Sequence, residues 1–183
     1  MTSAYKINLI ETVVNSSEAN DWKSAVVEWS IDDVEEDRTQ TVSCICGHTP
    51  IRYLFTIRNI VNGNKLCPIG STCIMKFERP DLNEEVSTKE QLYQLFHAIE
   101  DNTFLTLSPD FFSRKLLRNL FDLGAFKPSH YNDFQPHKDY DFMLKMFNKR
   151  KERTDNENKK VAAIILNSIK PFLQEILKIR RCG

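Results

Sequence analysis

Apolar residues recur at a helical spacing near the start of the chain and then give way to a charged segment. Residues 16–31 carry apolar side chains at i, i+3, i+4 and i+7, which predicts a helix with one buried face. The four positions are Trp22, Ala25, Val26 and Trp29. The hydrophilic stretch 32–40 holds five acidic residues and predicts a solvated loop.

Runs rich in β-branched and aromatic residues follow. Residues 41–46 predict one strand and residues 51–61 a second. Asn62-Gly63 is a favoured hairpin turn, after which residues 65–70 return as a strand. Beyond it, Ser71 is placed to cap a short helix over 72–77, and Pro80 closes the segment.

Helical signals dominate from about residue 85. A helix is predicted over residues 137–148, and Pro171 predicts a kink or break in the last helix. The predicted helix starts and stops are the capping box Ser87–Glu90, the N-cap Ser108 before Pro109, the stop at Gly124, and the capping box Thr154–Glu157.

These patterns predict an α+β fold with two domains. Residues 1–84 would form a small α+β module built on a β-hairpin and a helix, and residues 85–183 a mostly α-helical domain. No apolar run approaches the ~20 residues of a membrane helix, and the N-terminus lacks the basic region of a signal peptide. We therefore expect a cytoplasmic protein with no membrane partner.

Cysteine and histidine cluster in the first half of the chain. Thiols stay reduced in the cytoplasm, where clustered cysteines more often bind metal than form disulfides. Side chains alternate on a strand, so Cys44, Cys46 and His48 are predicted to face one side, and Gly47 lets the backbone bend between them. Cys73 falls in the first turn of the following helix. This set predicts a tetrahedral zinc site.

Two alternatives remain open for this site. Cys67 could replace His48 and give a four-cysteine site, although a buried apolar role suits Cys67 equally well in a strand. The whole cluster could also be reduced core thiols without metal. Four protein ligands leave no position for a substrate, and Glu78 is the one carboxylate between residues 43 and 80, so the zinc is predicted to be structural.

The segments CICGH, RYLFTIRNIVNG and PIGSTCIMKF resemble a zinc-binding module of bacteriophage and prophage proteins of unassigned function. The hairpin-to-helix layout is also similar to treble-clef zinc fingers. The resemblance covers about residues 20–80 and implies Cys44, Cys46, His48 and Cys73 as ligands, whereas the position of Cys67 is usually apolar in such modules. The second half resembles helical regions of similar phage proteins. This resemblance implies a fold and a host-cell cytoplasmic setting, but no mechanism.

The chain lacks the common catalytic motifs. It contains no Gly-rich phosphate loop, no G-x-S-x-G elbow and no H-E-x-x-H pair, which predicts a non-enzymatic protein. The enzyme alternative is a metal-dependent hydrolase using the acids and histidines of one segment. These residues are His130, Asp133, His137 and Asp139.

Local charge favours a binding function although the total is balanced, with 25 basic and 25 acidic residues. Residues 43–80 carry an excess of four positive charges, with Tyr53 and Phe55 interleaved among them, and residues 145–181 an excess of seven. The predicted contacts are Arg52, Arg58 and Lys65 in the first segment and Lys149, Arg150, Lys151 and Arg153 in the second. Basic residues with aromatics suit phosphate contact and base stacking, so DNA or RNA is the predicted partner.

The same charge segregation allows other partners. A molecule with acidic and basic ends can dock a charged protein or pair head to tail as a homodimer. The alternative function is therefore an effector that inhibits or redirects a host protein.

Overall fold

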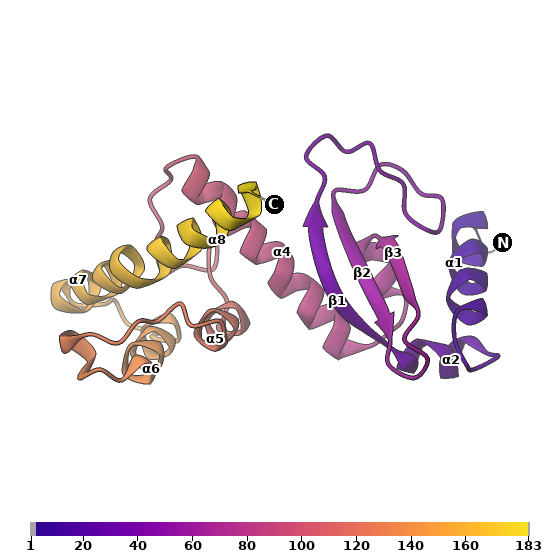
Figure 1. The fold of residues 1–183 in the computed structure, drawn as a ribbon. Helices are drawn as coiled ribbons and strands as arrows, with labels where there is room; N and C mark the ends of the chain where they lie inside the picture. Colours follow the sequence, from indigo (N-terminus) through magenta and orange to yellow (C-terminus); the bar gives the residue numbers. More distant parts are fainter. Residues whose placement is uncertain (1–2, 183) are drawn as a thin grey trace. The chain divides into compact units, whose positions relative to one another are not determined.

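The computed structural model describes the backbone of residues 3–182 and the side chains of residues 3–179. The chain has an α+β fold, as predicted, with an antiparallel sheet in the first half and helices in the second (Figure 1). It divides into two compact units, one ending at Lys89 and the other beginning at Glu90. The division falls inside the long helix α4 (Pro80–Glu100).

The first unit is built on three strands in the order β1-β2-β3, both pairs antiparallel. Its fully buried core includes Trp29, Phe55, Ile57, Ile69 and Ile74. Its elements before α4 are α1 (Ala4–Asn15), α2 (Trp22–Ala25), a 3₁₀ turn η1 (Val26–Glu28), β1 (Trp29–Glu36), β2 (Tyr53–Asn59), β3 (Lys65–Ile69) and α3 (Ser71–Met75). The predicted hairpin around Asn62-Gly63 is confirmed.

The predicted helix over residues 16–31 and the predicted acidic loop over 32–40 are both wrong. The α-helix ends at Ala25, and Trp29 begins β1 instead. The Trp29 indole is buried, and its Nε1 donates a 2.9 Å hydrogen bond to Ser17 Oγ. The acidic residues continue the strand, which pairs with β2: Asp32, Asp33 and Glu35 are exposed while Val34 is buried.

The predicted strand over residues 41–46 is also wrong. Residues 37–52 contain no helix or strand and form a loop between β1 and β2. The carboxylate of Asp37 organises its start by accepting hydrogen bonds from the backbone of Thr39, Thr41 and Val42. These side-chain hydrogen bonds, rather than pairing with a neighbouring strand, hold the start of the loop in a fixed turn.

The second unit is helical. Its elements after α4 are α5 (Arg114–Asp122), a 3₁₀ turn η2 (His130–Asn132), α6 (Pro136–Phe147), α7 (Asp155–Ile164), a π-helical segment η3 (Ile165–Ile169) and α8 (Lys170–Cys182). None of the helices within residues 3–182 combines the length and the apolar composition that crossing a bilayer requires.

Some predicted helix boundaries hold and others shift. The capping box of Thr154 and Glu157 is confirmed, and Gly124 follows the end of α5 with a left-handed φ of 82°. The π-helical segment lies directly before Lys170 and Pro171, where the interruption was predicted, because Pro171 has no N–H for the regular helical ladder.

Three predicted caps are wrong. Helix α4 begins at Pro80, with Leu82 and Val86 buried, so Ser87 lies inside a helix. The N-cap of α5 is Ser113, whose Oγ accepts from Leu116 N, because the turn that starts at Ser108 does not continue. The N-cap of α3 is Gly70, and Ser71 is its first residue.

Candidate metal centre

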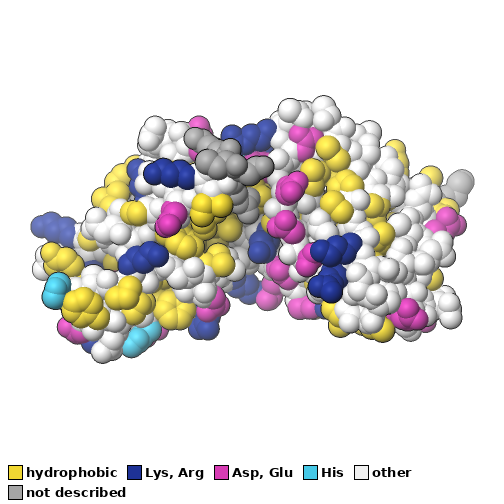
Figure 2. Space-filling view, in the orientation of Figure 1, with side chains coloured by type: hydrophobic (Ala, Val, Ile, Leu, Met, Phe, Trp, Pro, Cys, Tyr) yellow, Lys and Arg dark blue, Asp and Glu magenta, His cyan; other side chains and the backbone are white. Residues whose placement is uncertain are grey.

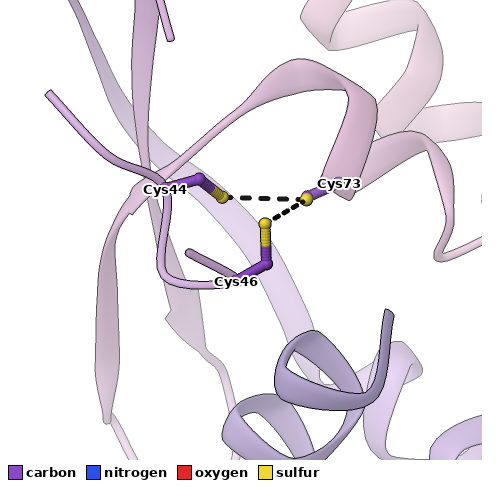
Figure 3. A group of neighbouring side chains, drawn as sticks. All are labelled: Cys44, Cys46 and Cys73. Atoms are coloured by element: carbon purple, nitrogen blue, oxygen red, sulfur yellow. Dashed lines mark hydrogen bonds between the residues drawn. The ribbon is translucent and has the colours of Figure 1, made fainter. Parts of the chain in front are cut away.

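Three cysteine sulfurs meet inside the first unit. The Sγ atom of Cys73 lies 3.7 Å from that of Cys44 and 3.5 Å from that of Cys46. All three side chains are buried, and their sulfurs lie within 4.8 Å of one another. Cys44 and Cys46 come from the loop between β1 and β2, and Cys73 from helix α3 (Figure 3). This group can hold a metal ion.

The spacing of the sulfurs fits a shared metal better than a disulfide. A disulfide would place two sulfurs about 2.05 Å apart. A tetrahedral zinc with Zn–S bonds of about 2.3 Å separates its sulfur ligands by about 3.8 Å. The separations of 3.5 and 3.7 Å are close to that value without any movement of the backbone.

A tight turn brings Cys44 and Cys46 together. Cys44 N donates to His48 O at 2.9 Å, and Gly47 N donates to Cys44 O at 2.7 Å. Gly47 has a φ of 91°, a left-handed conformation that a residue with a Cβ adopts only with strain. The chain therefore reverses at Gly47 instead of running on as a strand.

Neighbouring elements fix this turn in position. Ile45 N donates to Pro68 O on β3 at 2.9 Å, and Asn8 Nδ2 on α1 donates to Cys46 O at 3.2 Å. Helix α1 was not predicted from the sequence. The spacing of its buried residues Leu9 and Val13, with Ser3 as N-cap, was the signal that would have revealed it.

Backbone amides already point at two of the sulfurs. Gly70 N donates to Cys44 Sγ at 3.4 Å, and His48 N donates to Cys46 Sγ at 3.4 Å. Amide donors around a metal-binding thiolate offset its charge and hold its orientation. The site thus has part of the surrounding hydrogen bonding that a metal centre needs.

Cys44 and Cys73 differ in acidity. The hydrogen bond between their sulfurs is the largest factor that lowers the pKa of Cys44, to about 5. The same bond and burial raise the pKa of Cys73 above its ordinary value. A metal ion that takes all three sulfurs must therefore displace protons, so its binding releases protons into solution.

The structure brings together three of the five predicted ligands. The His48 ring is exposed and rests edge-on against Tyr5, with ring centroids 5.5 Å apart. Its nitrogens are outside the group whose ligand atoms lie within 4.8 Å of one another. Cys67 is also exposed, on β3. The identity of the fourth ligand stays a prediction.

The basic residues predicted in the first unit lie against the acidic strand β1. Arg52 Nε donates to Glu36 at 2.8 Å, and Lys65 Nζ donates to Asp32 at 2.6 Å. The hydrogen bond from Lys65 is the main cause that lowers the pKa of Asp32. The charge of Arg58, which is exposed on β2, lowers this pKa further. Figure 2 shows acidic and basic side chains close together over the sheet. The local excess along the sequence is therefore offset in space.

The basic segment of the second unit is only partly engaged. Lys149 Nζ lies 2.5 Å from Glu157, and Arg153 donates to Leu107 O at 3.2 Å. Arg150 and Lys151 are exposed and make no ion pair with any residue in the described part of the chain. Arg150 and Lys151 are thus exposed cations without an ion-pair partner among the described residues.

The residues of the hydrolase alternative serve other contacts. Asp139 is buried and accepts a 2.7 Å hydrogen bond from Asn132, while Asp133 pairs with Lys138 at 2.6 Å. The His130 ring packs against Phe134. Within residues 3–179, these histidines and acids do not form a group of converging metal ligands.

Comparison of the chain with protein-family models, with curated proteins and with solved structures found no match in any of the three.

Proposed function

We propose that Cys44, Cys46 and Cys73 bind one structural zinc ion. The observation that supports this is the set of sulfur separations of 3.5 and 3.7 Å among buried side chains. We propose His48 as the fourth ligand, reached by rotation of its side chain away from Tyr5, with Cys67 as the alternative. The metal would join the loop between β1 and β2 to helix α3.

We further propose that the protein is a non-enzymatic accessory protein that binds nucleic acid, in a phage-type setting as the sequence resemblance suggests. Exposed Arg150 and Lys151, between α6 and α7, carry this proposal because neither makes an ion pair with a carboxylate of the described chain. Such cations favour phosphates, so the contacts would be insensitive to base sequence.

The test is a double charge reversal, Arg150→Glu with Lys151→Glu. Lys149 is left unchanged because it holds Glu157 in the capping box of α7, and its reversal would confound binding with folding. A matched variant, Lys6→Glu with Lys23→Glu, makes the same change in net charge at exposed positions on α1 and α2.

The first variant should weaken binding to all oligonucleotides alike and flatten the salt dependence by about one unit per lost phosphate contact. The matched variant should leave the salt slope unchanged. Equal slopes for the wild type and the Arg150/Lys151 variant would reject the proposal.

A second candidate is an effector that docks on a host protein. The turn at η2 favours it, because Tyr131 there is 93% exposed while Asn132 beside it is buried and hydrogen-bonded to Lys127 O and Asp139. A rigidly presented tyrosine suits a protein interface. A stoichiometric host-protein complex that is lost in Tyr131→Ala and unaffected by nuclease would favour this candidate.

A further inference from the structure

A cavity of about 280 Å³ opens beside the cysteine triad in the first unit. The three cysteines form part of its wall, which continues onto α1, the start of β2 and α3. No aspartate or glutamate of the described chain lines it, whereas Arg52 and Lys76 do. Apart from the cysteines that we assign to the metal, the charged side chains of the wall are therefore basic.

The two cations of the cavity are held differently. Arg52 is fixed by Glu36 at 2.8 Å, and its guanidinium carbon lies 5.4 Å from the centre of the Tyr53 ring. Lys76 is half-buried and makes no ion pair or hydrogen bond through its ammonium group with the described residues. A half-buried cation without a counter-ion favours an anionic ligand.

Hydroxyl groups and aromatic rings complete the wall. The hydroxyls of Ser71 and Thr72 make no hydrogen bond to another described residue, so both can donate to an anion. Tyr5 is 46% exposed and Tyr53 is half-buried, and both line the same cavity. The Arg52 guanidinium lies over the Tyr53 ring, whereas Tyr5 contacts His48 edge-on, so Tyr5 is the ring on which a planar base can stack.

We propose that this cavity binds a nucleotide, with its phosphate at Lys76, Ser71 and Thr72 and its base against Tyr5. Two sources can supply this nucleotide, a free mononucleotide or the phosphorylated end of a strand. The second form rests on the proposed nucleic-acid binding, and the first does not. The site would make the protein prefer strands with a terminal phosphate.

The test uses the full chain loaded with zinc. Fluorescence anisotropy would compare an internally labelled oligonucleotide carrying a phosphate at its 5′ end, at its 3′ end or at neither. One phosphorylated form should bind about tenfold more tightly than the unphosphorylated strand, as expected for one charge-assisted hydrogen bond. AMP should compete away this gain, and inorganic phosphate should compete far less well because it has no base to stack.

Substitutions of single lysines test whether Lys76 causes the tighter binding of the phosphorylated strand. Lys76→Gln should abolish the gain and Lys76→Arg should retain it. Lys23→Gln is the matched control, because Lys23 is an exposed lysine of the same unit, on α2, and lies outside the cavity wall. It should keep the full gain. Zinc content and far-UV circular dichroism would verify that each variant is folded.

The outcomes separate this inference from the proposed function. Equal binding of all three strands would overturn the cavity site and leave strand binding intact. AMP binding that Lys76→Gln weakens about tenfold, without any strand binding, would support the cavity and reject the proposed function. Inorganic phosphate competing as well as AMP would overturn the nucleotide assignment. A Lys76→Gln variant with lower zinc content and an unchanged gain would overturn it too, since Lys76 would then serve the charge of the metal centre.

Discussion

Removing the metal is expected to unfold the first unit while the helices of the second unit remain. A structural zinc contributes on the order of 10 kcal/mol to the folding of a small module. Domain stabilities are themselves only about 5–15 kcal/mol. The loop of residues 37–52 has no ladder of its own, and Cys73 positions α3 with its buried neighbour Ile74. Loss of zinc should therefore leave the first unit without net stability.

The loss of folding free energy in Cys73→Ala distinguishes a metal site from simple packing of thiols. A Cys73→Ala change in a metal-free core removes one small buried group and should cost about 1 kcal/mol. The same change in a zinc site should release the metal and cost several times more, up to about 10 kcal/mol. The two interpretations thus predict very different shifts in a urea unfolding midpoint.

The two tryptophans provide a local assay. Both Trp22 and Trp29 belong to the first unit, and Trp29 is fully buried. A strong chelator, or Cys73→Ala, should shift tryptophan emission to the red and release one zinc per chain. Far-UV circular dichroism should keep most of the helical signal, which comes largely from the second unit. Folded, metal-free protein with unchanged emission, and a Cys73→Ala cost near 1 kcal/mol, would refute the zinc assignment.

Further predictions concern the ligand set and the helix caps. His48→Ala should weaken zinc binding while Cys67→Val is tolerated, and a competition titration with a chromogenic chelator showing the reverse order would assign the fourth position to Cys67. Thr154→Ala should cost ~1 kcal/mol in thermal or urea unfolding because it removes the α7 cap. Ser87→Ala should cost nothing and gain a few tenths of a kcal/mol, since Ser87 is exposed inside α4. Hydrogen bonds from Lys149 and Thr154 lower the pKa of Glu157, so ionised Glu157 stabilises the folded protein fully above its unfolded-state pKa near 4.5. This stabilisation is lost as the pH falls through the lower folded-state pKa. When stability is measured as the pH is lowered, Glu157→Gln should not show this loss of stability. An identical pH dependence of stability in the variant and the wild type would contradict this expectation.

The sequence predicted the chemistry of the site better than its geometry. Cys44, Cys46 and Cys73 could be identified because soft ligands at these spacings have few other uses in a reduced protein. The strand rule then placed His48 beside them. A bend at Gly47 was expected, but its positive φ turns the chain so that the His48 ring is exposed, and a pattern of residue types does not give the direction of a turn.

Charge counted along the sequence also differed from charge in space. The acidic residues of β1 looked like a solvated loop because hydrophilic runs usually are. Strand pairing with β2 instead sets Glu36 beside Arg52, and Asp32 beside Lys65 of the next strand. The charge excess within residues 43–80 is thus offset over the sheet, and the prediction could not include ion-pair partners from a segment assigned to a loop.

The loop of residues 37–52 is the strongest structural reason to expect a metal. Loops this long without secondary structure are uncommon in compact domains and need some other source of order. Asp37 organises the first turn through its bonds to Thr39, Thr41 and Val42, which keep its pKa below the ordinary range. Beyond that turn, the bonds from the Cys44–His48 turn to other segments include the backbone bond to Pro68, the Asn8 side-chain bond and the bond from Gly70 N to Cys44 Sγ. Three such bonds contribute about 1 kcal/mol each, too little to offset the entropy of ordering the loop. A zinc ion shared by Cys44, Cys46 and Cys73 would supply the missing stabilisation where the chain lacks a strand.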